Sequence, residues 1–157
     1  MQAAAMLEFH SLRIASADYH RPWGGFLVID PRDSHEFLRV FFPQYHIQNP
    51  VLHISPKLLI VNPGKRLSWQ YHNRRSEQWV LLQGDAGFFT SPTDDQPLDQ
   101  QLFPPKKEPV SISLGQRHRI VGGTQPSIIA EIWIHSDPAY PSDENDNYRL
   151  QDDTHRT

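Results

Sequence analysis

Four side chains that can bind a metal occur in one short stretch of the chain and one separate segment. Gln70, His72 and Glu77 fall between two glycines with the spacing G-x5-Q-x-H-x4-E-x6-G, and His118 follows in a later G-x-x-H segment. Two imidazoles, one amide oxygen and one carboxylate make a sulfur-free ligand set that suits a divalent ion. The sequence therefore predicts a metal site at these four residues.

The elements that carry these residues must bring them together. If residues 66–72 are extended, Gln70 and His72 project from the same side of the strand. The opposite side would then carry the larger apolar side chains, Leu67, Trp69 and Tyr71. A short turn over residues 73–76 would return Glu77 beside them on the next strand. The alternative is a hydrogen-bonded polar interior that retains the same residues without a metal.

Short β-strands are predicted for most of the chain. Its 157 residues can bury one core, and 14 prolines and 8 glycines are spread along them. Apolar runs alternate with polar turns from residue 57 onward, which predicts an all-β sandwich or barrel. The expected strands are 57–61, 66–72, 77–83, 86–90, 110–114, 118–121 and 128–135.

Three segments lie outside this pattern of strands. Residues 1–20 are expected to form an N-terminal arm or a lead-in strand, and residues 136–157 a polar C-terminal tail. Residues 33–56 are expected to form an inserted helix and loop. The helix would run from Ser34 to Phe42 and be ended by Pro43. The apolar face of this helix consists of Phe37, Leu38, Phe41 and Phe42. It predicts packing on the outer sheet, with a lid over the barrel mouth as the functional alternative.

Composition excludes several classes of function. The chain has no cysteine, so disulfides, thiolate metal sites and thiol nucleophiles are excluded. Its formal charge of −3 and scattered basic residues predict no nucleic-acid partner and no electrostatic membrane anchor. The first residues show neither a signal peptide nor a membrane span, so a cytoplasmic location is expected.

Four motifs taken together resemble the cupin domain of type II mannose-6-phosphate isomerases. They are RPWG at 21–24, LSWQYHNRRSEQW at 67–79, GQRH at 115–118 and SDENDNYRLQDDTHR at 142–156. The resemblance implies a single cupin domain over residues 1–157, a double-stranded β-helix or jelly-roll barrel with one short inserted helix. The chain departs from the family pattern at Asn73, Arg74, Gln78 and Thr154-His155, and it shows no preceding nucleotidyltransferase domain.

A metal-dependent aldose–ketose isomerase is the activity that this resemblance implies. The substrate would be a sugar phosphate, first of all mannose 6-phosphate, converted to fructose 6-phosphate. Type I mannose-6-phosphate isomerases hold zinc with a glutamine, two histidines and a glutamate, so zinc is expected here, with manganese, cobalt, nickel or iron as alternatives. The ion would polarise the sugar carbonyl and stabilise an enediolate. The resemblance also implies a homodimer.

Further residues are candidates for catalysis and substrate binding. Arg75 keeps an arginine of the family pattern and is a candidate phosphate clamp, since a guanidinium binds phosphate through two parallel hydrogen bonds. Arg149 and Arg156 occupy family positions in the tail. Glu131 is a charge in an otherwise apolar strand, so a general base, a support for a ligand histidine and an ion-pair partner are all open. Lys65 is a second candidate base.

Two rival functions come from other classes. A non-catalytic cupin that binds a sugar or nucleotide sugar would explain the replaced histidines and the altered tail. A metal-dependent oxygenase is possible because cupins support many reactions, although Gln70 in place of a histidine weakens it.

Overall fold

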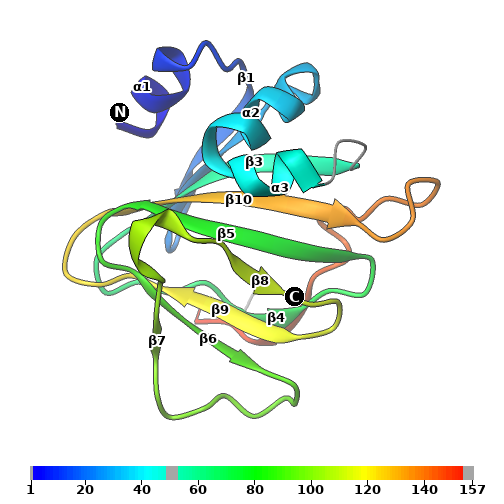
Figure 1. The fold of residues 1–157 in the computed structure, drawn as a ribbon. Coiled ribbons are helices and arrows are strands. Elements are labelled where there is room, and N and C mark those ends of the chain that lie inside the picture. Colours follow the sequence, from blue (N-terminus) through cyan, green and yellow to red (C-terminus); the bar gives the residue numbers. More distant parts are fainter. Residues whose placement is uncertain (1, 49–52, 154–157) are drawn as a thin grey trace.

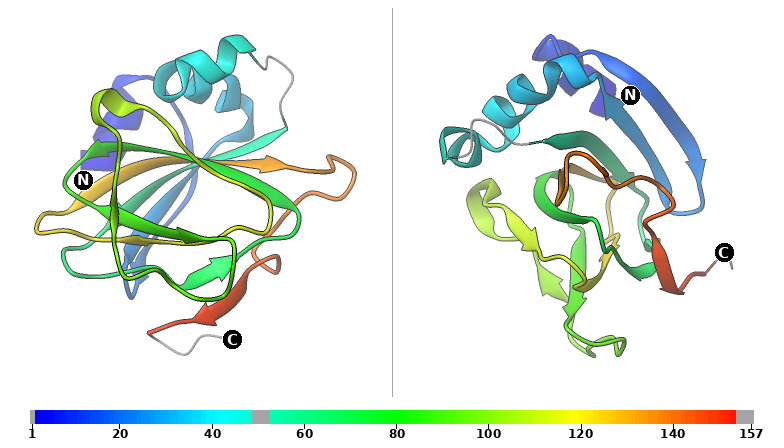
Figure 2. Two further views of the ribbon diagram at one scale, coloured as in Figure 1. Left: turned by 60° about the horizontal axis from the view of Figure 1, so that its bottom comes forward. Right: turned by 90° about the vertical axis from the view of Figure 1, so that its right-hand side faces the viewer.

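Two antiparallel sheets face each other and close into a barrel, which confirms the predicted all-β cupin fold (Figures 1 and 2). The computed structural model describes residues 2–48 and 53–153. The six-stranded sheet contains, in spatial order, β1 (Ile14–Arg21), β2 (Gly24–Ile29), β3 (Ile54–Val61), β10 (Ser127–His135), β5 (Arg75–Gln83) and β8 (Val110–Ile112). The five-stranded sheet contains β11 (Tyr148–Gln151), β4 (Trp69–Tyr71), β9 (Arg117–Val121), β6 (Gly87–Ser91) and β7 (Gln101–Leu102).

The six-stranded sheet is covered on both faces, and this explains why its central strand β10 is almost entirely apolar. Ile128, Ala130 and Ile132 lie in a cluster with the helices, whereas Ile129 belongs to a second cluster inside the barrel. Side chains alternate along the strand, so Glu131 shares the inner face with Ile129. Glu131 is the Cα partner of Lys57 on β3 and of Trp79 on β5. These three residues therefore form one row across the inside of the barrel.

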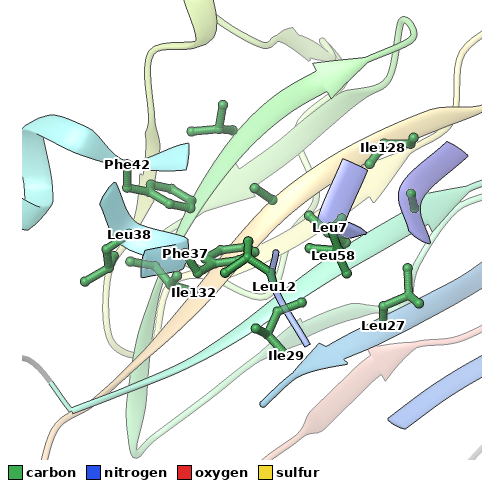
Figure 3. Close-up of a cluster of buried hydrophobic side chains, with 13 residues drawn as sticks. Leu7, Leu12, Leu27, Ile29, Phe37, Leu38, Phe42, Leu58, Ile128 and Ile132 are labelled. Atoms are coloured by element: carbon green, nitrogen blue, oxygen red, sulfur yellow. The ribbon is translucent and has the colours of Figure 1, made fainter. Parts of the chain in front are cut away.

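Helices cover the outer face of this sheet. They are α1 (Gln2–Phe9), α2 (Ser34–Phe41) and α3 (Pro43–Gln48), and two short 3₁₀ turns lie at Pro31–Asp33 and Pro105–Lys107. Phe37, Leu38 and Phe42 point from the α2 segment toward the sheet residues Leu58 and Ile132 (Figure 3). The inserted helix thus packs on the side of the six-stranded sheet that faces away from the second sheet, not over the barrel mouth (Figures 1 and 2). None of the helices in the described part of the chain has the length and apolar run needed to cross a bilayer.

The structure differs from the sequence prediction in the helical regions. Residues 2–9 are helical, although an arm or strand was expected, because Ala3 and Leu7 are buried against the core and tertiary contact stabilises so short a helix. Pro43 ends α2 as predicted but also begins α3, which a proline permits since the first helical residue needs no amide hydrogen bond.

Pro56 was expected in a loop but lies inside β3, opposite Ile132 of β10. The pairing of β3 with β2 extends only to Lys57, so no strand on that side requires an amide hydrogen from Pro56. The C-terminal tail likewise gains structure, because β11 joins β4 at the edge of the second sheet and pairs Arg149 with Gln70.

Replacement of Phe37 by alanine tests the placement of α2. Its side chain is fully buried on the outer face, so Phe37→Ala should lower the free energy of unfolding by about 3–5 kcal/mol. Phe41→Ala should cost less, because Phe41 is only partly buried at the edge of the cluster. Urea unfolding measures both losses, and zinc affinity should stay unchanged. A helix that closed the mouth would instead show a small loss of unfolding free energy and a changed zinc affinity.

Candidate functional site

Three of the four predicted metal ligands meet between the two sheets. His72 follows β4, His118 lies on β9 and Glu77 lies on β5, and one ligand atom from each falls within 4.8 Å of the others. All three side chains are buried. Because β4 and β5 belong to different sheets, Glu77 approaches from across the barrel and not from a neighbouring strand of the same sheet, as the sequence had suggested.

Gln70, the fourth predicted ligand, lies beside this cluster. It is the Cα partner of His118 on the adjacent strand, so the two side chains share a face, and its amide oxygen accepts a hydrogen bond of 2.7 Å from the Ser68 hydroxyl. The predicted continuous strand 66–72 is interrupted, since β4 covers only Trp69–Tyr71. Leu67 consequently lines the same cavity as Gln70, and its predicted place on the opposite face was wrong.

Hydrogen bonds to the main chain orient both histidines. His72 donates from Nδ1 to the carbonyl oxygen of Asp146 at 2.7 Å, and His118 donates from Nδ1 to that of Gln116 at 2.8 Å. The two Nε2 atoms then face each other at 3.1 Å. Burial lowers the pKa of His118 to about 4 despite the opposing charge of Glu77, so its Nε2 carries a lone pair at neutral pH.

The arrangement fits a divalent ion. Besides the 3.1 Å between the imidazoles, His72 Nε2 lies 3.1 Å from Glu77 Oε1, and His118 Nε2 lies 3.7 Å from Glu77 Oε2. Ligand atoms bound to one zinc ion at about 2.0–2.1 Å are themselves roughly 3.0–3.4 Å apart. Two lone pairs that face each other and a carboxylate at these distances can all bind one metal cation placed between them.

Arg75 lies directly against these ligands. Its Nε donates to Glu77 Oε1 at 2.9 Å and its Nη2 to His72 Nε2 at 3.1 Å. The guanidinium carbon stands 3.6 Å from the centre of the Trp133 ring, and Arg75 is only 3% exposed. The residue predicted as a phosphate clamp is therefore enclosed beside the cluster of His72, Glu77 and His118.

The tail between β10 and β11 holds the turn that precedes Arg75. The Asp146 carboxylate accepts hydrogen bonds from the amides of Asn73 and Arg74, both 2.9 Å, and from the Ser142 hydroxyl at 2.7 Å. Burial raises the pKa of Asp146, but these hydrogen bonds outweigh it and hold the pKa below its usual value. Sequence reasoning missed Asp146, although the tail motif that contains it was noticed.

Glu131 is buried next to Glu77. The Trp79 indole N–H donates to Glu77 Oε2 at 3.0 Å and to Glu131 Oε1 at 3.3 Å. Burial and, after it, the neighbouring Glu77 carboxylate raise the pKa of Glu131 to about 8. Glu131 therefore holds a proton at neutral pH and lies in the inner row beside the cluster.

Lys57 is a further site residue that the sequence prediction missed. Its Nζ lies 3.5 Å from the centre of the Trp133 ring and 3.0 Å from Glu144 Oε1, and the side chain is buried. The signal was available, because Lys57 opens the apolar run KLLIV, as Glu131 interrupts SIIAEIWIH.

A cavity opens beside the cluster and is rich in cations. Its charged lining consists of Arg21, Lys57, Arg75, Arg149, Glu77, Glu131 and Glu144. Four cations there face three carboxyl groups, and the pKa of one of these, Glu131, is raised by burial and by Glu77. Lys65 lies elsewhere, exposed in a separate depression beside Arg66 and Asp153. Arg156 and the Thr154-His155 pair lie outside the described residues.

The barrel and its internal cluster of histidines and a carboxylate define a cupin with a candidate metal centre. The chain belongs to the family described as mannose-6-phosphate isomerase C-terminal, whose model matches residues 44–152. A search of curated proteins found no significant relative.

Solved structures show the same fold. The capsular polysaccharide assembling protein CapF from Staphylococcus aureus is similar with a TM-score of 0.57 and 17% identity, over 90% of this chain and 34% of that chain. A structure of CapF with the inhibitor 3-isopropenyl-tropolone is similar with a TM-score of 0.57 and 16% identity, over 90% of this chain and 35% of that chain. The chain thus spans about a third of the CapF chain.

The raised pKa of Glu131 predicts an unusual pH dependence of stability in metal-free protein. Between the ordinary pKa of 4.5 and the folded value of about 8, the folded protein keeps a proton that the unfolded chain has released. Stability is then lost as pH rises, by up to about 1.4 kcal/mol per pH unit. The side chain in Glu131→Gln cannot ionise. The free energy of unfolding of this variant relative to wild type, measured by urea unfolding with EDTA, should therefore rise from pH 5 to pH 8. A difference that does not change with pH would contradict the assignment.

Proposed function

We propose that this protein is a metal-dependent aldose–ketose isomerase acting on a sugar phosphate, with mannose 6-phosphate and fructose 6-phosphate as the first candidates. The observation that carries the proposal is the buried cluster of His72, Glu77 and His118, which opens on a cation-lined cavity in a chain of the mannose-6-phosphate isomerase C-terminal family. Such a cavity suits a phosphorylated substrate.

His72, Glu77 and His118, with Gln70 beside them, would hold one divalent ion, for which zinc is the first candidate. When bound, the ion supplies a Lewis acid for the carbonyl and enediolate oxygens of the sugar. The chain itself must move the proton between neighbouring carbons and keep the substrate anchored by its phosphate.

Glu131 is the proposed proton carrier. It faces the cavity, whereas Lys65 is exposed in a separate depression, so position favours Glu131. Its carboxylate would take the proton from C2 of the open-chain aldose and return it to C1, with an enediolate between the two steps and the O2 hydroxyl proton passing to O1. The pKa of Glu131, about 8, lies close to neutral pH. A cation bound at the neighbouring Glu77 would offset part of the rise in this pKa.

Phosphate recognition is proposed for the remaining cations of the cavity. Arg149 is placed there by β11, and Arg21, which pairs with Asp18 and lies over the Phe26 ring, lines the same cavity. The contacts of Arg75 with His72 and Glu77 favour a role at the reacting oxygens over a clamp on the distant phosphate.

A coupled assay tests the proposal. Metal-free protein reloaded with zinc, manganese or cobalt should turn over at least one member of a panel of hexose and pentose phosphates. His118→Asn and Glu131→Gln should each lower kcat/KM at least about a hundredfold, the first by loss of the metal and the second with the metal retained. Phe41→Ala, on the outer face, is the matched control and should keep its activity.

Other outcomes assign the protein to a rival class. Binding of zinc and a sugar phosphate without turnover of any panel member would contradict the isomerase and support a sugar-binding cupin. Oxygen consumption after loading with iron would support an oxygenase instead.

A further inference from the structure

Two groups compete for one lone pair of electrons in the cluster. His72 carries its proton on Nδ1, where it donates to the Asp146 carbonyl, so its Nε2 has a single lone pair. The Arg75 Nη2 donates to this lone pair at 3.1 Å. The same lone pair points toward His118 and Glu77, where a metal ion would bind. One lone pair cannot serve both groups.

The conflict does not extend to Glu77. Its Oε1 accepts from Arg75 Nε at 2.9 Å and its Oε2 from the Trp79 indole at 3.0 Å, and each carboxylate oxygen offers more than one lone pair. Glu77 can therefore bind a metal and keep both hydrogen bonds. Competition between arginine and metal is confined to His72 Nε2.

The rest of the guanidinium is held independently of His72. Nη1 donates to the Ser142 hydroxyl at 2.8 Å and to the Asp143 carbonyl at 3.2 Å, and the guanidinium stacks on Trp133. Loss of the contact with His72 therefore leaves Arg75 in place beside the cavity that it lines.

We propose that metal binding displaces the Arg75 Nη2 hydrogen from His72 and makes this N–H available to the cavity, as a donor to a negatively charged oxygen beside the metal. The inference rests on the metal site of the proposed function and deepens it by giving Arg75 a role that depends on the metal. Metal binding and oxyanion binding are then coupled, and each strengthens the other.

A purely supporting role for Arg75 predicts the opposite behaviour. If the arginine only oriented Glu77, its removal would weaken metal binding by about 10–100-fold, as is common for residues that position a ligand. Under the competition proposed here, its removal releases the lone pair of His72 and strengthens metal binding. The sign of the change separates the two roles.

Zinc affinity of Arg75→Met and Arg74→Met, measured by competition with a chromophoric chelator, tests the proposal. Methionine keeps apolar contact with Trp133 but offers no N–H. Arg75→Met should bind zinc about tenfold more tightly than wild type, the equivalent of one lost charge-assisted hydrogen bond. Arg74 makes its ion pair with Asp143 and does not contact the ligands, so Arg74→Met loses the same charge and should stay within about twofold. Weaker or unchanged zinc binding by Arg75→Met would overturn the proposal.

Arg75→Lys is a second variant for the case that Arg75→Met misfolds. Lysine keeps a positive charge beside Glu77 but cannot donate to Glu77 and His72 at once, as the guanidinium does. This variant too should bind zinc more tightly than wild type. With sulfate as the oxyanion probe, zinc should raise sulfate affinity more in wild type and Arg74→Met than in either Arg75 variant, and an equal rise in all four would contradict the coupling. These readouts do not require turnover, so an inactive protein that shows them would refute the isomerase and leave this inference standing.

Discussion

The hydrogen bonds between Asp146 and the turn after β4 set the geometry of the part of the site that holds His72 and Arg75. The chain crosses from β4 in one sheet to β5 in the other over residues 72–74, and the crossing is short. Asp146 binds two amides of this turn with its carboxylate and the His72 ring with its main-chain oxygen. One residue of the tail therefore fixes the first histidine ligand and the segment that carries Arg75. His118 and Glu77 are oriented separately, by the Gln116 carbonyl and by Arg75 and Trp79.

The inside of the barrel gathers charges that would each be costly to bury alone. Arg75 and Glu77 neutralise each other, Lys57 pairs with Glu144, and both cations lie against Trp133. Glu131 accepts a hydrogen bond from the neutral Trp79 indole but forms no ion pair with a cation in the described part of the chain, and it stays protonated. The apolar outer face, covered by α1 and α2, stabilises the sheet that carries this row (Figure 3). The outer face of the sheet thus carries apolar packing, whereas the inner face carries the charged row beside a second apolar cluster.

Local patterns in the sequence predicted much of this arrangement. The apolar run 128–135 predicted a strand with one charged residue, and the spacing of Gln70, His72 and Glu77 with a distant His118 predicted the cluster. Spacing could not tell that β4 and β5 lie in different sheets, because a turn of four residues serves a hairpin and a crossing equally well. The break at Leu67 was missed for a similar reason, since it depends on pairing with β9 and not on residue type. Asp146 acts through contacts more than 70 residues away in the chain, and no local pattern reports those. Lys57 also has a distant partner, Glu144, but its charge at the start of the apolar run KLLIV was a local signal.

Anomalous diffraction from crystals of the zinc-saturated protein, recorded on both sides of the zinc absorption edge, tests the central claim most directly. The account predicts one anomalous peak between the sheets, at bonding distance from the Nε2 atoms of His72 and His118 and from the Glu77 carboxylate, with Gln70 completing the set. Zinc-saturated crystals without a peak between these residues, or with their only peak on the outer surface, would contradict it.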